Sequence, residues 1–265
     1  MDDFGFTINS KTFYQMTQSE ITLYWAPAHG LGNQYDFSHL YPSPLSLYEE
    51  LTPLKVDLKD NRDDYLRCPA VSNRLKKTFV FRTTTNTSVK IVDGSYIAYE
   101  FSSEDDMRRH QTTVELLHKP TLNGHHLLNY LHPIIFFTDA PSLTVSISPP
   151  HFQKTVHSNY GVIVPGEFDV ARWFRPMNFE FQLWEGVTEL KIPAGEPIGY
   201  VECQTDAKIV LKKFNLTQRL NRLSSSLIHV SPHRRFTKLS EKYKLFTNAK
   251  ISGGILREIQ DNLVE

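Results

Sequence analysis

The chain has 265 residues, of which 40% are hydrophobic and 22% are charged, and its formal net charge is zero. This composition is typical of a globular protein that is long enough to bury a full core. No run of about 18 apolar residues occurs, which excludes an ordinary membrane-spanning helix. No period of 20–50 residues repeats, which excludes a solenoid or a propeller.

Up to about residue 211 the sequence reads as short strands separated by turn residues. Phe79 and Phe81 alternate with polar or smaller residues, so they share one face of a strand. Asp93-Gly94 predicts a two-residue hairpin. The predicted strands are Glu20–Ala26, Lys76–Thr83, Val89–Val92, Tyr96–Phe101, Thr112–His118, Pro133–Thr138, Leu143–Ser148, Gly161–Val164, Phe179–Trp184, Val187–Ile192 and Ile198–Cys203. So many short strands without strand–helix alternation predict a β-sandwich or a closed barrel.

Two segments depart from this strand pattern. Residues 27–75 hold several prolines and predict a loop-rich cover over the β core. After Lys208, apolar residues recur at helical spacing, first from Phe214 to Leu227 and then from Phe236 to Phe246, with a break at Pro232. Gly253-Gly254 is expected to precede a short last helix, Ile255–Leu263. We therefore expect a β domain over residues 1–211 and a helical tail over residues 212–265.

The charges separate along the chain. Residues 1–206 hold 17 Lys and Arg against 25 Asp and Glu, a net charge of −8, whereas residues 207–265 hold 12 against 4, a net of +8. The basic tail fits a solvated helix face, a contact with the body or with a neighbouring subunit, or a nucleic-acid backbone. We expect a homo-oligomer or another protein as partner, with nucleic acid as an alternative and no membrane. The candidate contact residues are Lys212, Lys213, Arg219, Arg222, Arg234, Arg235 and Lys238.

Four segments between Cys68 and Val201 occur in a familiar order. Cys68-Pro69-Ala70 leads to Lys77–Val80, then Gly166–Pro176, then Ile192–Val201. This order resembles an uncharacterised family of cupin-like, jelly-roll proteins that is frequent in tailed phages of marine bacteria. The resemblance covers about half of the chain. It implies a double-stranded β-helix core and a viral origin, and it implies no activity.

Histidines cluster in the middle of the chain, and convergent imidazoles can hold zinc or iron. The candidates are His125, His126, His132, His151 and His157. Ile192–Val201 also resembles the second half of a cupin, but the strand after its turn has no histidine. His125 and His126 are adjacent and would face opposite ways on a strand. We therefore expect a polar turn there, no bound metal and no cofactor.

Asp169, Arg172, Trp173 and Arg175 form the main candidate for ligand binding. An arginine fork beside an aromatic ring suits a carboxylate or a phosphate. The same residues also fit a structural corner in which Arg175 pairs with Asp169 and Trp173 fills the core.

The chain has two cysteines, Cys68 and Cys203, and its first residues, Met1-Asp2-Asp3-Phe4, lack a basic and apolar signal segment. We expect reduced, buried thiols and a location in the host cytoplasm or a virion rather than secretion.

The functional hypothesis is a non-catalytic binding or structural accessory protein, encoded by a phage, that self-associates or binds a protein. Whether it is an enzyme stays uncertain, with the balance against catalysis. A cupin-like enzyme acting on a small polar ligand in the barrel mouth is the first alternative. Nucleic-acid binding through the tail is the second.

Overall fold

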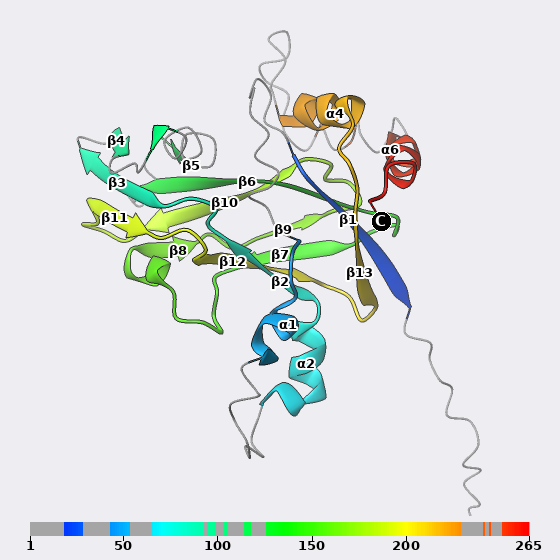
Figure 1. The fold of residues 1–265 in the computed structure, drawn as a ribbon, viewed down its shortest axis with the longest axis horizontal. Helices are drawn as coiled ribbons and strands as arrows, with labels where there is room; N and C mark the ends of the chain where they lie inside the picture. Colours follow the sequence, from blue (N-terminus) through cyan, green and yellow to red (C-terminus); the bar gives the residue numbers. More distant parts are fainter. Residues whose placement is uncertain are drawn as a thin grey trace, which may run out of the picture.

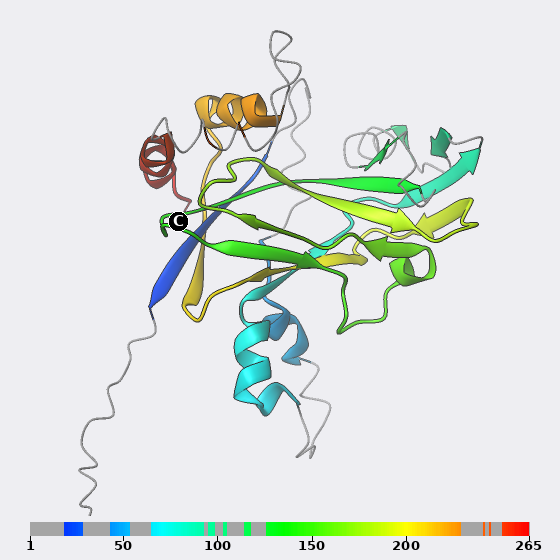
Figure 2. The same cartoon turned by 180° about the vertical axis from the view of Figure 1, so that it is seen from behind.

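The computed structural model describes residues 19–28, 43–53, 65–92, 95–98, 103–104, 114–117, 126–228, 241, 244 and 251–264. Within these ranges the chain is mainly β, with sheets in the middle and helices on the two outer sides (Figure 1). Figure 2 shows the same layers from behind. The predicted mainly β architecture is confirmed. None of the described helices is long and apolar enough to cross a membrane.

The large sheet has six strands in the order β13-β1-β6-β10-β8, with β5 also paired to β6. They are β1 (Glu20–Pro27), β5 (Val114–Leu117), β6 (Leu127–Thr138), β8 (Gly161–Ile163), β10 (Pro176–Leu183) and β13 (Lys208–Lys213). β6 is long enough to hold two partners along one edge, β5 at its start and β1 at its end. β13 runs parallel to β1 at the end of the sheet, whereas the other pairs are antiparallel.

Two smaller sheets face the large one. The four-stranded sheet has the order β2-β12-β7-β9, and the three-stranded sheet has the order β11-β3-β4. Their strands are β2 (Thr78–Arg82), β3 (Thr87–Val92), β4 (Ser95–Ala98), β7 (Thr144–Ser148), β9 (Gly166–Asp169), β11 (Glu189–Ile192) and β12 (Pro197–Cys203). From β6 to β10 each successive strand changes sheet, so the chain winds back and forth across the sandwich.

The core between the sheets is filled by aromatic and branched side chains. Phe81 packs edge-on against Phe136, with ring centroids 5.9 Å apart, and lies 5.2 Å from the ring of Phe179. Gly199 permits this packing, because a Cβ atom there would lie 3.2 Å from the Phe179 ring. Phe79 faces the same core as Phe81, which confirms the predicted alternation of β2.

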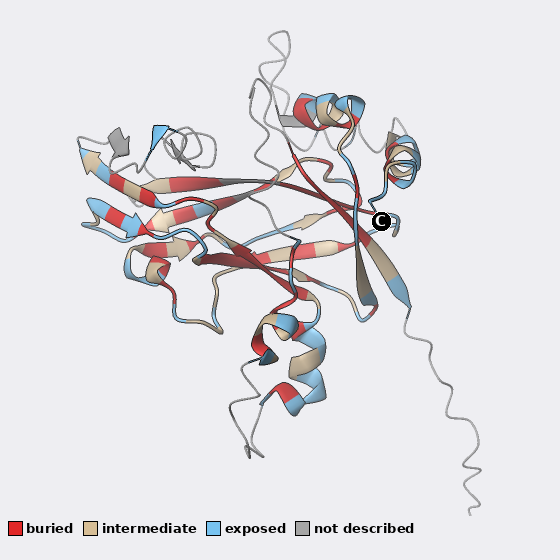
Figure 3. Cartoon of the chain, viewed as in Figure 1, coloured by how far each residue is buried: buried red, intermediate tan, exposed pale blue. Residues whose placement is uncertain are grey.

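The outer face of the large sheet is covered by the C-terminal helices α4 (Gln218–Ile228) and α6 (Ile251–Gln260). We call these helices, with Phe214, the C-terminal cover. They pack on sheet residues that include Tyr24 and Phe137, and Phe214 and Leu220 are each only 1% exposed. β1 and β6 are therefore buried on both faces (Figure 3), which explains their nearly continuous apolar runs.

The outer face of the four-stranded sheet is covered by α1 (Leu47–Leu51), the 3₁₀ turn η3 (Tyr65–Arg67) and α2 (Pro69–Leu75). We call these three elements the N-terminal cover. Leu47, Leu66 and Leu75 pack on Val80 and Tyr200 of the sheet. The expectation of a loop-rich cover over 27–75 is thus wrong for the described part, which is largely helical. Short helices were missed because each offers only one or two turns of apolar spacing.

Each of the eleven predicted strands overlaps a strand of the structure. β9 was missed because Pro165-Gly166 was interpreted as a reversal, and β13 was missed because its lysines were assigned to the tail. The expected boundary at residues 211/212 falls within β13, which is a strand of the large sheet. The last helix begins at Ile251 rather than at Ile255, so Gly253 and Gly254 lie inside it. The predicted helix from Phe236 to Phe246 lies outside the continuously described residues.

Candidate binding cleft

The N-terminal cover is fixed to the sheet by its first helix. Ser46 caps α1 by accepting a hydrogen bond from the backbone N–H of Glu49, whose carboxylate accepts bonds from the Ser46 backbone and hydroxyl. Glu50, one residue further, pairs with Arg82 of β2 over 2.5 Å between Oε2 and Nη2. The helix start and its orientation on the sheet are therefore both set by charged groups.

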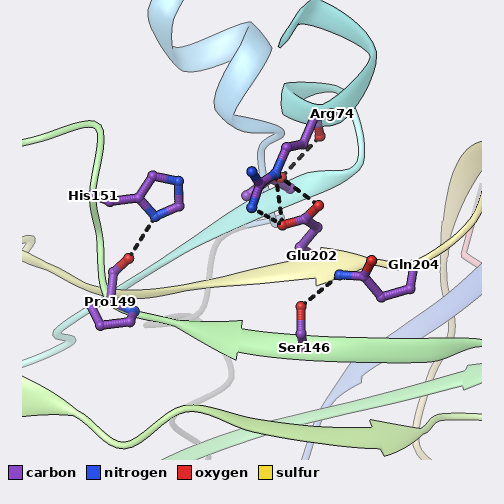
Figure 4. A network of polar contacts seen from close by, with 7 residues as sticks. Arg74, Ser146, Pro149, His151, Glu202 and Gln204 are labelled. Atoms are coloured by element: carbon purple, nitrogen blue, oxygen red, sulfur yellow. Dashed lines mark hydrogen bonds and ion pairs between the residues drawn. The ribbon is translucent and has the colours of Figure 1, made fainter. Parts of the chain in front are cut away.

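The second helix, α2, is held on the sheet by a bidentate ion pair (Figure 4). Arg74 of α2 donates to both carboxylate oxygens of Glu202 on β12, from Nε over 2.9 Å and from Nη2 over 2.8 Å. The hydrogen bond to Glu202 raises the pKa of the Arg74 guanidinium, which keeps Arg74 charged. On the neighbouring strand Ser146 accepts a bond from Gln204. The polar outer face of the sheet thus anchors α2.

A cleft of about 610 Å³ opens where this cover meets the edge of the large sheet. Its lining consists of Pro44, Leu45, Ser46, Tyr48, Glu49, Asn73, Lys76, Lys77, Phe79, Ala207, Lys208, Ile209 and Leu211. A volume of this size is within the usual range for ligand sites. The floor is apolar, and Leu45 at the mouth is 51% exposed.

The rim of the cleft is basic. Lys76 lies with its ammonium 4.9 Å from the centre of the Tyr48 ring, and Lys77 donates to the carbonyl of Thr205. Lys208 pairs with Glu20 over 2.6 Å at an exposed position. Three lysines thus line the cleft against one carboxylate, Glu49, which already caps α1. The site favours an anionic partner.

The backbone at the cleft includes an edge strand. The N–H groups of Lys208 and Phe214 donate to carbonyls of the β1 segment, which places the even-numbered residues of β13 toward β1. Backbone groups alternate along a strand, so those of Ile209 and Leu211 point to the opposite edge. At that edge the carbonyl of Lys213 accepts a bond from the N–H of Val264. No described residue pairs with β13 between Ile209 and Leu211.

The segment Asp169–Arg175 is a structural corner in this geometry. Asp169 accepts bonds from the Ser142 hydroxyl and from the backbone N–H groups of Leu143 and Ala171. The Asp169 carboxylate also forms an ion pair with Arg172, at 3.6 Å, and the expected pair with Arg175 stays a prediction. Because the Asp169 carboxylate is saturated by its own chain, it has little capacity for a ligand.

The aromatic part of the same corner also differs from expectation. Trp173 is only half-buried, with its ring 5.1 Å from that of Phe168 and the Arg175 guanidinium 4.9 Å above it. Phe174, which is fully buried, fills the core instead. The interpretation in which Trp173 fills the core is therefore wrong, since its neighbour Phe174 fills it.

The candidate histidines occupy separate places. His157 is 2% exposed, packed edge-on against Tyr130 and Phe181, and burial lowers its pKa to about 4. His151 is exposed on the other side of the sheet, against Phe152, and His132 pairs with Met177 in the large sheet. His126 precedes β6, and His125 lies outside the described residues. Among the described side chains, no three potential ligands gather into a metal site.

The two cysteines differ from each other. Both thiols are free, as expected. Cys203 is buried in the core, where desolvation raises its pKa to about 12. Cys68, however, is exposed at the start of α2, so the expectation that it is buried is wrong. A reduced thiol can be buried or exposed, so the oxidation state that the sequence indicates does not fix the exposure of Cys68.

Two of the basic candidate residues form contacts within the chain. Lys213 lies with its ammonium 5.2 Å from the centre of the Trp25 ring, and Arg219 is 3.4 Å from Glu258, which joins α4 to α6. Lys212 and Arg222 are exposed. Arg234, Arg235 and Lys238 lie outside the described residues.

The sequence did not single out the residues of the cleft. The adjacent Lys76-Lys77 pair at a strand start and Lys208 at the charge boundary were the available signals, but only the fold brings them together.

In comparison with known proteins, no protein-family model matches this chain and no curated protein matches it.

Proposed function

We propose that this chain is a non-catalytic binding protein that contacts a protein partner through the basic cleft beside β13. The observation that carries the proposal is the cleft itself. It combines an apolar floor, a lysine rim and an uncovered strand edge, and it is built on helices that are already fixed to the sheet. Such a preformed surface binds without having to order the groups that make the contact.

The filled interior supports binding over catalysis in a barrel mouth. The aromatic rings of Phe81, Phe136 and Phe179 occupy the space between the sheets, and His157 packs against Tyr130 and Phe181 in the same core. A cupin-like enzyme needs room there for its substrate. The cleft described above lies outside this core, at the edge of the large sheet.

The winding of the chain supports a jelly-roll origin for the sandwich. Successive strands from β6 to β10 alternate between two facing sheets, which is the pattern of a double-stranded β-helix. Together with the resemblance to a phage family, this favours a viral accessory component. The location that we propose on this basis is the host cytoplasm or a virion.

Self-association is a second candidate, favoured by the separation of charge between a body at −8 and a tail at +8. Identical chains can join acidic face to basic tail in a head-to-tail contact. Nucleic-acid binding is less favoured, because Lys213 and Arg219 already have contacts inside the chain. Light scattering of the full chain at low and moderate salt tests self-association, and a monomer under both conditions would remove it.

The test of the main proposal is a selection from a random twelve-residue peptide library displayed on phage, with the full chain as bait. We expect the selected peptides to lose binding to Leu45→Glu, which places a negative charge in the mouth of the basic cleft. Val92→Glu is the matched control, since Val92 is 47% exposed on β3 and does not line the cleft. Selected peptides that bind Leu45→Glu as well as the parent would overturn the proposal.

A further inference from the structure

We infer that the partner presents an acidic, extended segment that adds to the outer edge of β13 as a further strand of the large sheet. This inference rests on the proposed function and names the chemistry of its ligand. Three independent features of the cleft specify that chemistry: a free backbone edge, an alternation of side chains along it, and the sign of its charge.

The edge of β13 that no described residue pairs, between Ile209 and Leu211, accepts an extended chain. The N–H and C=O groups of Ile209 and Leu211 point away from β1, toward the cleft that both residues line. Strand addition satisfies such groups with main-chain hydrogen bonds, whatever the sequence of the ligand. The edge of β2, on the facing sheet, is already paired by the chain. The carbonyl of Leu45 accepts a bond from the N–H of Val80, so the chain covers that edge itself.

The side chains of β13 alternate in a way that selects the ligand's own pattern. Ile209 and Leu211 are half-buried against the core between the sheets, on the face that they share with Leu23. Lys208 and Lys212 are exposed on the other face. A strand laid beside them gains most if its apolar residues continue the first face and its carboxylates continue the second.

The charge of the edge decides between possible occupants. A second copy of β13 would set the lysines of one strand against those of the other, which is unfavourable for directly opposed like charges. An acidic strand meets Lys208 and Lys212 across the edge and Lys76 at the rim of the cleft. We therefore assign the edge to an acidic segment of a different protein.

The experiment measures the binding of a labelled seven-residue peptide, in which glutamate and valine alternate, to the full chain by fluorescence polarisation. We expect saturable binding that weakens at least tenfold when the amides facing the edge are N-methylated, because N-methylation removes hydrogen-bond donors and keeps the charge. A peptide that alternates lysine with valine should bind at least tenfold more weakly than the glutamate peptide.

Variants of the protein locate the peptide. The double variant Lys76→Glu and Lys208→Glu should weaken binding of the glutamate peptide at least tenfold, whereas Lys154→Glu, an exposed lysine outside the cleft, should leave it within twofold. Equal binding of the N-methylated and unmethylated peptides would overturn strand addition and leave only attraction between charges. Equal binding to the double variant would also overturn the inference.

The experiments distinguish a failure of the strand inference from a failure of the proposed function. If the glutamate peptide does not bind, but peptides from the selection bind in a manner that depends on Leu45, the cleft is a binding site of another chemistry and only the strand inference is overturned. If neither kind of peptide depends on Leu45, the proposed function falls as well.

Discussion

The two helical covers of the sandwich are held on their sheets by different kinds of contact. Both place short helices on the outer face of a sheet. The C-terminal cover closes its face with apolar side chains, and Phe214, Leu220 and Ile259 are almost completely buried. The N-terminal cover also has apolar contacts, but it is positioned by Arg74–Glu202 and Arg82–Glu50, and it leaves an open cleft at its margin. The closely packed face and the face of the proposed binding cleft thus lie on opposite sides of one sandwich.

The largest expected effect compares the same substitution in the two covers. Phe214→Ala should lower the free energy of unfolding by about 3–5 kcal/mol, because it removes buried contacts and leaves a cavity. Phe152→Ala, at a half-buried position against the N-terminal cover, should cost less than half of that. Urea unfolding of the two variants measures the difference. Equal losses would show that the covers contribute alike.

The second prediction concerns the pH dependence of stability, which His157 in the core between the sheets controls. His157 has a pKa of about 4 in the folded chain, against about 6.5 when exposed, because burial disfavours its charged form. Between pH 4 and pH 6.5 the imidazole of His157 binds a proton in the unfolded chain but not in the folded chain. The stability that neutral His157 contributes is therefore present at neutral pH and is lost as the pH falls from about 6.5 to about 4. The loss is about 3 kcal/mol at most.

The measurement is urea unfolding of the parent and of His157→Phe at several pH values. The parent should lose stability on acidification relative to this variant. His151→Phe, at an exposed ring, should follow the parent. A pH profile that His157→Phe leaves unchanged would contradict the buried, neutral state of His157.

A smaller effect is expected for the ion pair that anchors α2. Arg74 is 54% exposed, so solvent and salt screen its pairing with Glu202, and Glu202→Gln should cost about 0–1 kcal/mol. The variant should nevertheless alter peptide binding, since Asn73, Lys76 and Lys77 of the cleft adjoin Arg74 in sequence. Glu189→Gln serves as a control, since Glu189 forms an exposed pair with Lys90 and neither residue lines the cleft. A large loss of stability would place Glu202 among the structural determinants of the N-terminal cover.

The smallest effect on stability is expected from alkylation of Cys68. Iodoacetamide should modify this exposed thiol in the folded protein without a change in melting temperature. Cys203, buried in the core between the sheets with its pKa raised to about 12, should react only after unfolding. Mass spectrometry of the native and unfolded protein counts the modified thiols. Two modified thiols in the native protein would contradict the burial of Cys203.

The strands were predictable because most alternate or form short apolar runs between clear turn residues. Phe79 and Phe81 show the alternation, and Gly186 and Gly195, both with positive φ, lie in the turns before and after β11. α1 and α2 were not predictable, since five and seven residues are too few for a helical period to emerge.

The cleft was least predictable of all. Its lysines come from positions 76, 77 and 208, and no local pattern links residues that far apart. The candidates chosen from local clusters, Asp169 to Arg175, proved to be bonded to their own chain. A dense polar motif indicates a corner as readily as a site.

The parallel pairing of β1 with β13 has a consequence for the order of folding. Glu20 and Lys208 are 188 residues apart in the sequence, yet their side chains meet at the start of this pair. Contacts between such distant segments form late, because closing a long loop is costly before other contacts reward it. During synthesis β1 can pair with β6 well before β13 leaves the ribosome. We therefore expect the edge that carries the cleft to form after β1 has paired with β6, so that the proposed binding surface appears only on a sheet that has already begun to assemble.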